Sequence, residues 1–433
     1  MDFAYRDMHV HFVGAGGVSM SGLMRLAHRH GAKVTGSDRR NSDTLRALQN
    51  EGFEVYVGHC PQLAEAADLV VYTAAVPADD PERRAARASM ERSEWLGHVS
   101  RLYRTVVAVA GTHGKTTVCG MLTAILHHAG ASFSAHVGGD VPYTDHGTYL
   151  GGDELFLTEA CEYQRHFLHL TPTIGIITNV EHDHPDCYPD ADSVYRAFGL
   201  FALRCGTVLT CDPRVACMTA HTHTCTYTDI CIQRDPMHEG RYALRHMGRE
   251  IDFSLRVWGD FNAFNAAYAA SCAMHLGVSD DAIREGLSHY TGAARRQQQL
   301  GTYRGMPVLS DYAHHPTEIR AVCREAAARY GKICVVFEPH TYSRTRALLT
   351  QFADCFVGEI LYLLPTYAAR EADDPAVDGM LAAAIRNVPA HTTTWPALRG
   401  ILQKTPHKKY GAIIFVGAGT VHNDALELVA LER

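Results

Sequence analysis

The feature that most constrains the fold is a glycine-containing loop that joins a short apolar strand to a helix. The strand-like run TVVAVA ends at Ala110, and a polar loop follows directly. Apolar residues then recur at helical spacing through the stretch VCGMLTAILHHAG, so the loop opens onto a helix N-terminus. Backbone N–H groups at such an N-terminus cradle phosphate. The loop consists of Gly111, Thr112, His113, Gly114, Lys115, Thr116 and Thr117.

Two side chains of this loop have the chemistry of a nucleoside triphosphate site. Lys115 is placed to reach the β- and γ-phosphates, and the Thr116 hydroxyl is placed to hold Mg²⁺. The usual loop reads G-x-x-x-x-G-K-[ST], whereas here Ala110 stands at the first glycine position and Gly111 lies three residues before Gly114. We therefore expect a shortened phosphate loop that binds ATP or GTP.

A second glycine loop follows the first strand-like run of the chain. The segment Val13–Gly22 (VGAGGVSMSG) opens a helix, and Asp38 closes the next strand in TGSD. Glycines in such a turn let the backbone approach a pyrophosphate, and the acidic residue accepts hydrogen bonds from a ribose. Ser19 occupies the third glycine position of G-x-G-x-x-G. Alone, the pattern suggests a NAD-type Rossmann fold; the phosphate loop downstream favours a different nucleotide.

Short β-branched runs alternate with helical stretches along the whole chain. This alternation predicts parallel sheets of the α/β class. The expected strands cover 9–13, 34–37, 69–73, 106–110, 154–158, 174–178, 333–337 and 412–416. With 433 residues, the chain is long enough for two or three domains. We place the boundaries near residues 103 and 297, giving units 1–103, 104–297 and 298–433.

Acidic and imidazole side chains follow two strands beyond the phosphate loop. Glu159 lies in LTEACEY, and His184 lies in TNVEHDHPD. In an α/β sheet both segments fall at the carboxyl edge, where phosphates and their metals bind. Carboxylate oxygens and a neutral imidazole complete the coordination of Mg²⁺ or Mn²⁺ on nucleotide oxygens.

Charged residues also end two strands of the last third. Asp311, His314 and His315 lie in SDYAHHPTE, and Arg344 lies in EPHTYSRTR. Such groups neutralise a substrate carboxylate or the charge that develops on a transferred phosphoryl group; a solvated cationic helix start is the alternative. The alternating run 221–225 (HTHTC) is interpreted as a half-exposed strand without function.

Composition excludes several classes of protein. Forty Lys and Arg against 47 Asp and Glu give a net charge of −7, which offers no general attraction for nucleic acid or anionic membranes. We find neither a signal peptide nor a membrane-spanning apolar stretch. Thirteen cysteines without a C-x-x-C pair fit reduced thiols. We therefore expect a cytoplasmic protein.

The ordered motifs together resemble the Mur ligase family, and within it the members that add L-alanine to UDP-N-acetylmuramate. The resemblance covers nearly the whole chain. It rests on GAGGVSMSG, GSD, TAAVPADDPE, GTHGKTT, HVGGD, EACEY, TNVEHDHPDCY, GDFNAFNA, GAARR, DYAHHPTEI and EPHTYSRT.

The resemblance implies three domains: a Rossmann-like domain for the UDP moiety, a central phosphate-loop ATPase with a mainly parallel sheet, and a C-terminal Rossmann-like domain for the amino acid. It implies that the lactyl carboxylate attacks the ATP γ-phosphate and that the amine of L-alanine attacks the resulting acyl phosphate. Charge neutralisation and positioning are what such a transfer needs. Two Mg²⁺ sites are implied, and the chain would act as a monomer or a dimer.

The resemblance also assigns roles to individual residues. The uridine diphosphate would contact Gly14, Gly16, Gly17, Met20, Ser21, Gly22 and Asp38. The first Mg²⁺ would bind Thr116 and Glu159, and the second His184. The ATP would contact the residues of the phosphate loop together with Asn262, Asn265, Arg295 and Asp311. The reacting groups would meet Lys115, Glu159, His184, His314, His315 and Arg344.

Three positions depart from the family pattern. Gly199 stands where several members carry a carbamylated lysine, so no carbamate bridge is expected. Thr341 replaces an arginine that is common after the histidine of EPH. Gln297 replaces the aromatic residue that commonly follows the arginine pair.

Three alternatives remain at this point. A recycling ligase that attaches a preformed tripeptide to UDP-N-acetylmuramate would share both nucleotide sites. A folylpolyglutamate synthase would lack the N-terminal UDP domain. A non-catalytic nucleotide- or NAD-binding protein would not need Lys115, Glu159 and His184 together.

Overall fold

The computed structural model describes residues 5–219, 225–227 and 230–432, and its chain divides into two compact units. The first unit comprises residues 1–180, 195–255 and 265–290. The second comprises 181–194, 256–264 and 291–433. The expected run 221–225 lies largely outside the described residues; β12, Cys225–Tyr227, begins at its end.

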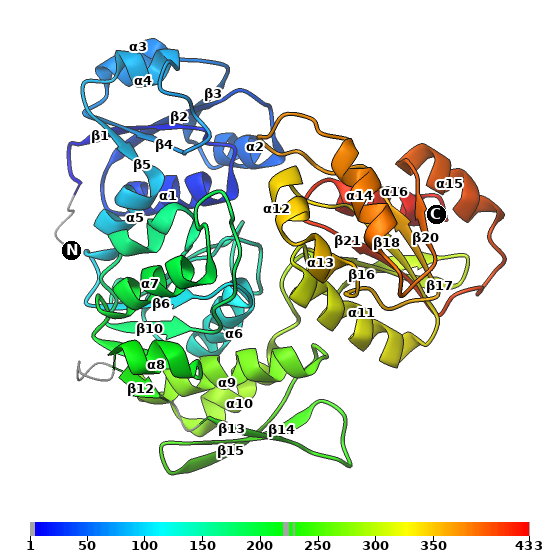
Figure 1. Ribbon diagram of the computed structural model, residues 1–433. Helices are drawn as coiled ribbons and strands as arrows, with labels where there is room; N and C mark the ends of the chain where they lie inside the picture. Colours follow the sequence, from blue (N-terminus) through cyan, green and yellow to red (C-terminus); the bar gives the residue numbers. More distant parts are fainter. Residues whose placement is uncertain (1–4, 220–224, 228–229, 433) are drawn as a thin grey trace. The chain divides into compact units, whose positions relative to one another are not determined.

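The first unit opens with a five-stranded parallel sheet in the order β3-β2-β1-β4-β5 (Figure 1). Because the order reverses beside β1, the glycine loop after it lies at a topological switch point, where α/β sheets bind ligands. The strands are β1 His9–Val13, β2 Lys33–Asp38, β3 Glu54–Val57, β4 Leu69–Tyr72 and β5 Ser89–Glu91. The helices are α1 Val18–Arg29, α2 Asp43–Asn50, α3 Pro61–Ala66, α4 Pro81–Ala85 and α5 Arg92–Ser100.

Side chains of β1 alternate between the two faces of this sheet. Phe12 packs edge-on against Trp95 of α5, with ring centroids 6.2 Å apart. Val13 packs instead with Ala64 of α3 and with Val70. Both faces are therefore covered, as expected for a parallel sheet.

The second sheet of the first unit has seven strands in the order β12-β11-β10-β6-β9-β7-β8, all parallel except β8. The phosphate loop follows its central strand, β6. The other strands are β7 Phe133–His136, β8 Thr148–Leu150, β9 Leu155–Glu159, β10 Ile174–Ile177 and β11 Thr207–Thr210, with β6 at Thr105–Ala110. The helices are α6 Lys115–His128, the 3-10 helix Tyr163–His169, α7 Ala191–Ala202, α8 Pro213–Thr219, α9 Asp260–His275 and α10 Asp280–His289; the first residues of α7 and α9 are assigned to the second unit.

A three-stranded antiparallel sheet, which the sequence analysis did not predict, also belongs to the first unit. It consists of β13 Cys231–Arg234, β14 Arg241–His246 and β15 Arg249–Ser254. Buried and exposed residues alternate along β14, as they do in a sheet with one wet face. Such short alternating strands carry a weaker signal than the apolar runs of parallel sheets.

The second unit is built on a six-stranded sheet in the order β16-β17-β21-β18-β19-β20, parallel except for β16. Helices α11, α13 and α14 pack on one face, and α15 and α16 pack on the other. The strands are β16 Gln298–Tyr303, β17 Met306–Asp311, β18 Ile333–Phe337, β19 Ile360–Leu363, β20 Ala390–Thr392 and β21 Ala412–Val416. The helices are α11 Pro316–Tyr330, α12 Tyr342–Ala347, α13 Leu349–Phe352, α14 Ala376–Ala384, α15 Trp395–Lys404 and α16 Val421–Ala430.

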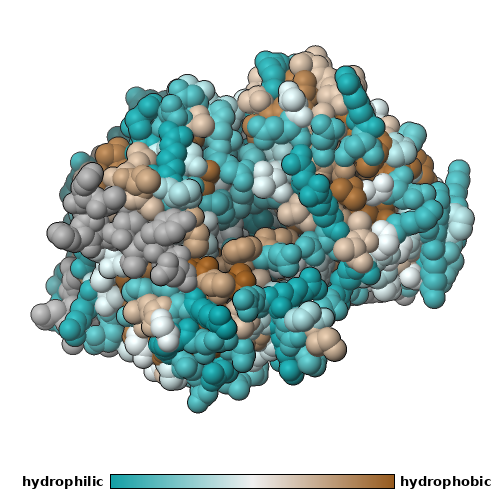
Figure 2. All heavy atoms as spheres, turned by 60° about the horizontal axis from the view of Figure 1, so that its bottom comes forward, coloured by the Kyte–Doolittle hydropathy of each residue, from teal (hydrophilic) through white to brown (hydrophobic). Residues whose placement is uncertain are grey.

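The surface is mainly hydrophilic where it can be seen. On the face shown in Figure 2, apolar side chains form small separate groups among polar ones. Within the described ranges, none of the helices combines the length and the apolarity that crossing a membrane requires.

The crossing of α6 and α10 depends on a glycine. A Cβ atom added at Gly286 would overlap the Cα of Ile125 and lie 2.6 Å from its backbone nitrogen. The backbone of α6 cannot move aside as a flexible side chain would. We predict that Gly286→Ala lowers the free energy of unfolding by about 1–3 kcal/mol because the site becomes overpacked.

Chemical denaturation of the purified variants tests this prediction. Gly400→Ala in α15 is the matched control, because a Cβ there meets no atom within 4 Å. We expect the control to be neutral or stabilising by up to about 1 kcal/mol. Equal stability of wild type and Gly286→Ala would contradict the close approach of the two helices.

Candidate active site

The phosphate loop adopts a backbone that only glycine accepts easily. Gly114 lies in the left-handed region, with φ of 86°, and forms the N-cap of α6 without a side-chain cap. An added Cβ at Gly114 would lie 2.5 Å from Oδ1 of Asn265. The first N–H groups of α6 are therefore left for an anionic ligand. Asn265, which the resemblance places at ATP, is beside this loop.

The end of β10 fixes the loop from the neighbouring strand. The Thr112 N–H donates to the Asn179 carbonyl at 3.1 Å, and the His113 N–H donates to Asn179 Oδ1 at 2.9 Å. The Thr178 hydroxyl donates to the His113 carbonyl at 2.6 Å. Sequence reasoning assigned no role to Thr178 or Asn179, although both stand directly after a predicted strand.

Lys115 is held by a buried carboxylate. Its Nζ lies 2.9 and 3.1 Å from the two oxygens of Glu162 and also donates to the carbonyls of Gly111 and Thr112. Burial lowers the pKa of Lys115, but the Glu162 carboxylate outweighs it and raises the pKa above its ordinary value. Lys115 is thus charged at neutral pH. Glu162 was absent from the predicted site.

Thr116 and Glu159 both lie beside a pair of glycines from the HVGGD motif. The Gly138 N–H donates to Glu159 Oε1 at 2.8 Å, and an added Cβ at Gly138 would lie 3.0 Å from Oε2. An added Cβ at Gly139 would lie 3.3 Å from the Thr116 methyl group. The glycines leave open space around a hydroxyl and a carboxylate, which is the donor set that Mg²⁺ prefers.

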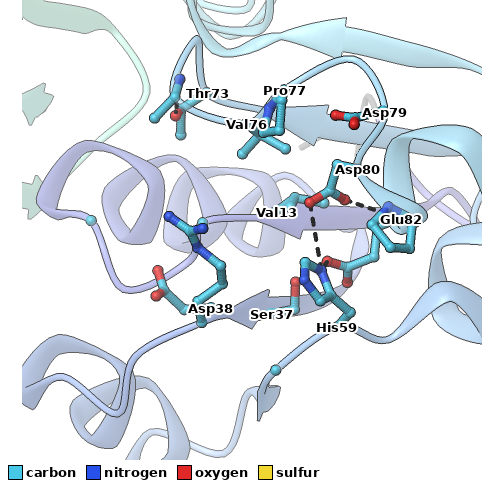
Figure 3. Close-up of a pocket in the computed structure, with 16 residues that line it drawn as sticks. Val13, Ser37, Asp38, His59, Thr73, Val76, Pro77, Asp79, Asp80 and Glu82 are labelled. Atoms are coloured by element: carbon cyan, nitrogen blue, oxygen red, sulfur yellow. Dashed lines mark hydrogen bonds and ion pairs between the residues drawn. The ribbon is translucent and has the colours of Figure 1, made fainter. Parts of the chain in front are cut away.

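The N-terminal glycine loop borders a cavity at the ends of β1, β2 and β4 (Figure 3). Gly14, with φ of 91°, Gly17 and Asp38 line this cavity. Asp38 accepts hydrogen bonds from the N–H groups of Gly16 and Arg40, each at 2.9 Å. The loop thus presents glycine backbone and an oriented carboxylate to the same space.

Three further residues of the predicted UDP site lie inside α1. Met20, Ser21 and Gly22 are buried, and the Ser21 hydroxyl donates to the Val18 carbonyl. An added Cβ at Gly22 would lie 2.8 Å from His136 Nδ1. These residues pack the helix, and the cavity is lined by the loop before them.

Arg92 approaches the start of α1 from α5. Its guanidinium donates to the Ser19 hydroxyl at 3.1 Å, and that hydroxyl lies 2.9 Å from His136 Nε2. Burial lowers the pKa of His136 to about 3, so its ring is neutral. The replacement of the third glycine by Ser19 therefore joins the glycine loop to β7. Sequence reasoning did not identify Arg92.

In the second unit, Arg344 and Asp183 form a buried ion pair. Arg344 Nε lies 2.8 Å from Asp183 Oδ1, and a second guanidinium nitrogen contacts the imidazole of His340 at 3.1 Å. Burial raises the pKa of Asp183, but Arg344, His184 and His314 outweigh it and hold that pKa well below its usual range. Arg344 was predicted; Asp183 and His340 were quoted only within motifs.

The two predicted histidines beside this pair differ in their settings. His184 has a left-handed backbone with φ of 54°, and its Nε2 lies 3.7 Å from Asp183 Oδ2. His314 Nδ1 contacts the Tyr312 carbonyl at 3.0 Å. Burial lowers the pKa of His314 to about 3 and that of His340 to about 4. The rings of His314 and His340 are therefore uncharged at neutral pH.

His315 has a structural contact that the sequence did not reveal. It is the N-cap of α11, where its ring accepts from the Thr317 N–H and the Glu318 side chain completes a capping box. The ring is buried, and its Nδ1 lies 3.5 Å from Glu181 Oε2. Capping explains why a polar ring is buried at this position.

Two of the remaining predicted ATP contacts of the second unit, Asn262 and Asp311, are linked through Gln297. The Gln297 N–H donates to Asp311 Oδ2 at 2.7 Å, and its side-chain oxygen accepts from Asn262 at 3.2 Å. Burial raises the pKa of Asp311 to about 6. Arg295 donates to the carbonyls of Gly417 and Gly419 at 3.1 and 3.0 Å, and burial lowers its pKa.

The other two positions that depart from the family pattern are Thr341 and Gly199, and each has specific neighbours. Thr341 is the N-cap of α12 with φ of 66°, and its N–H donates to the Tyr367 carbonyl at 2.9 Å. Gly199 lies within α7, where an added Cβ would come 2.8 Å from the Met218 methyl group.

The buried pair of Arg344 and Asp183 yields a stability prediction. Arg344→Gln leaves a buried carboxylate uncompensated, so we expect a loss of about 3–5 kcal/mol at pH 7. The pKa of Asp183 is depressed in the folded state. The stabilising effect of the pair is therefore complete above the unfolded pKa and is lost as the pH falls below about 4.

Denaturation curves at several pH values check both the size and the sign. Arg346→Gln is the control, because Arg346 pairs with Asp374 at an exposed position and its loss should cost under about 1 kcal/mol. A difference between Arg344→Gln and wild type that grew toward acidic pH would contradict the pairing.

Comparison with known proteins identifies the family. Three Mur ligase profiles match in order: the catalytic domain over residues 9–104, the middle domain over 109–273 and the glutamate ligase domain over 295–416. A UDP-N-acetylmuramate--L-alanine ligase of Clostridium novyi is 36% identical over 436 residues, covering 95% of each chain.

Solved structures show the same fold. A UDP-N-acetylmuramate-alanine ligase from Thermotoga maritima aligns with a TM-score of 0.77 and 24% identity, covering 98% of this chain and 99% of its own. A murein peptide ligase from Psychrobacter arcticus aligns with a TM-score of 0.72 and 22% identity, covering 98% of both chains. With three matching profiles and a full-length relative, the chain belongs to the Mur ligase family.

Proposed function

We propose that this protein is an ATP-dependent ligase that joins L-alanine to the lactyl carboxylate of UDP-N-acetylmuramate, as the names of its full-length relatives describe. The observation that carries the proposal is the charged Lys115, held at the N-terminus of α6 beside Thr116 and Glu159. This arrangement suits the transfer of a phosphoryl group between anions.

The reaction proceeds in two steps in this proposal. The lactyl carboxylate displaces ADP from the γ-phosphate and forms an acyl phosphate. The amine of L-alanine then attacks the acyl carbon, and phosphate leaves as the amide forms. Lys115 stabilises the negative charge on the transferred group. The amine must lose a proton as the amide forms.

Each substrate has a proposed place. The uridine diphosphate lies in the cavity of Figure 3 against Gly14, Gly17 and Asp38. The ATP phosphates lie on the loop before α6. We assign ATP contacts also to Asn262, Arg295 and Asp311, and the neutralisation of substrate or phosphate to Arg344.

Thr116 and Glu159 would hold Mg²⁺, and His184 would hold a second ion; Mn²⁺ is the alternative metal. Bound Mg²⁺ would neutralise phosphate oxygens.

We retain three functional domains, 1–103, 104–297 and 298–433, as part of the proposal. Because the reaction consumes ATP, we place it in the cytoplasm.

A tripeptide-recycling ligase is the second candidate. The observation in its favour is that this chain and the Psychrobacter arcticus murein peptide ligase align over 98% of both chains. Eight curated relatives at 34–37% identity are named UDP-N-acetylmuramate--L-alanine ligase. We therefore rank the alanine reaction first.

Phosphate release tests the reaction directly. The purified chain is given ATP, Mg²⁺ and UDP-N-acetylmuramate, with L-alanine, glycine, L-serine or the stem tripeptide as acceptor. We expect the greatest stimulation by L-alanine, and product mass should equal that of UDP-N-acetylmuramoyl-L-alanine. Stimulation by tripeptide alone would assign the chain to recycling, and no stimulation by any acceptor would overturn the ligase proposal.

Lys115→Ala should lower kcat by at least about 100-fold, because it removes the charge that stabilises the transferred phosphoryl group. Lys332→Ala is the matched control, since Lys332 pairs with Glu359 on the surface, and its rate should equal that of the wild type. Comparable rates for the two variants would remove Lys115 from the reaction.

Glu159→Gln tests the proposed metal ligand. We expect the Mg²⁺ concentration for half-maximal rate to rise by about tenfold or more, since an amide oxygen binds Mg²⁺ more weakly than a carboxylate. Glu359→Gln, at an exposed position, should leave the Mg²⁺ dependence unchanged. An unaltered dependence in Glu159→Gln would exclude this ligand.

A further inference from the structure

One imidazole and two carboxylates converge in the wall of the N-terminal cavity. His59 follows β3, and Asp80 and Glu82 lie at the start of α4; Figure 3 shows the three side chains pointing toward one another. His59 Nδ1 lies 3.5 Å from Asp80 Oδ2 and 3.4 Å from Glu82 Oε2. One ligand atom from each of the three residues lies within 4.8 Å of the others. The proposed ligase reaction uses none of these residues.

These separations are long for charge-assisted hydrogen bonds, which are about 2.7–2.9 Å. His59 Nδ1 also has at most one proton for two oxygens at nearly equal distance. A tetrahedral zinc ion with bonds to nitrogen and oxygen of about 2.0–2.2 Å instead holds neighbouring ligand atoms roughly 3.3–3.6 Å apart. The two measured distances fall in this range.

The outward oxygens of both carboxylates are already fixed by hydrogen bonds. Asp80 Oδ1 accepts from the Glu82 N–H at 2.9 Å. Glu82 Oε1 accepts from His11 Nε2 and from the Cys60 N–H, both at 3.0 Å. His11 Nδ1 is itself held by the Thr35 hydroxyl at 2.7 Å. Such outer contacts orient carboxylate ligands in metal sites and leave the inner oxygens directed at His59.

The charge of the cluster also favours a cation. Asp80 is 7% exposed and Glu82 is 1% exposed. Across the described parts of the chain, no lysine or arginine pairs with either carboxylate. Buried negative charge of this kind requires compensation.

We propose that His59, Asp80 and Glu82 form a binding site for one divalent transition-metal ion, with Zn²⁺ as the best match. One nitrogen and two oxygen ligands suit tetrahedral Zn²⁺, whereas Mg²⁺ prefers six oxygen ligands. The fourth position faces the cavity, where water or an oxygen of a bound nucleotide completes the coordination. Because the cavity is shared, ion and nucleotide affect each other's affinity; this coupling rests on the proposed function.

Cobalt binding provides a direct test that needs no ligase activity. The full-length protein, in excess Mg²⁺, is titrated with Co²⁺ and then with Zn²⁺. We expect the intense visible absorption of four-coordinate Co²⁺, displaced by one equivalent of Zn²⁺. His59→Gln and Asp80→Asn should lose this absorption, with Zn²⁺ affinity at least about tenfold weaker.

The control is His128→Gln, which alters a separate exposed group formed by His128, Glu285 and His289. It should retain the absorption. Asp80→Asn keeps an acceptor for the Glu82 N–H, and melting temperatures confirm folding. Equal Co²⁺ spectra and Zn²⁺ affinities in wild type and both site variants would overturn the proposal, as would a weak six-coordinate spectrum in wild type. UDP is then added as the nucleotide probe, and an unchanged Zn²⁺ affinity would overturn the coupling alone.

Discussion

The conformation of the loop between β6 and α6 is the constraint on which the first unit depends. Gly111 and Gly114 both have positive φ values, and the loop N–H and carbonyl groups are tied to Thr178 and Asn179. These contacts exist because β10 pairs with β6 in parallel register, which brings the carboxyl ends of the two strands together. β9 pairs on the other side of β6 and brings Glu159 to the same edge. The sheet order therefore assembles the loop, the lysine and the carboxylates.

Much of the parallel fold could be predicted from the sequence. Strands buried on both faces are rich in β-branched and other apolar residues, and the expected runs 9–13, 333–337 and 412–416 match β1, β18 and β21 residue for residue. The antiparallel strands β13 to β15 lacked this signal. Positions of loops and motifs at strand ends were also predictable, because parallel strands end at a common edge.

The partners of the site residues were harder to predict. Glu162 and Asp183 are acidic residues inside recognised motifs, yet nothing in a linear sequence shows that one pairs with Lys115 and the other with Arg344. His315 shows the converse. Its place near the reacting groups stays a prediction, and the linear sequence did not show that its side chain also caps α11. Local sequence identifies the type of group; pairing across tens of residues depends on packing.

Buried carboxylates in the two units differ in how their negative charge is compensated. Asp183 has a guanidinium within hydrogen-bond distance, so its negative charge is compensated by the protein itself. Among the described residues, Asp80 and Glu82 form ion-pair contacts only with imidazoles, and their inner oxygens lie 3.4–3.5 Å from His59 Nδ1. In an ion pair such as that of Asp183 and Arg344, each partner compensates the charge of the other, so neither needs a further ligand. In the N-terminal cavity, one oxygen of each carboxylate is held by hydrogen bonds, while the other oxygen has only a long contact to His59. Carboxylates arranged in this way in a cavity wall can still bind a ligand.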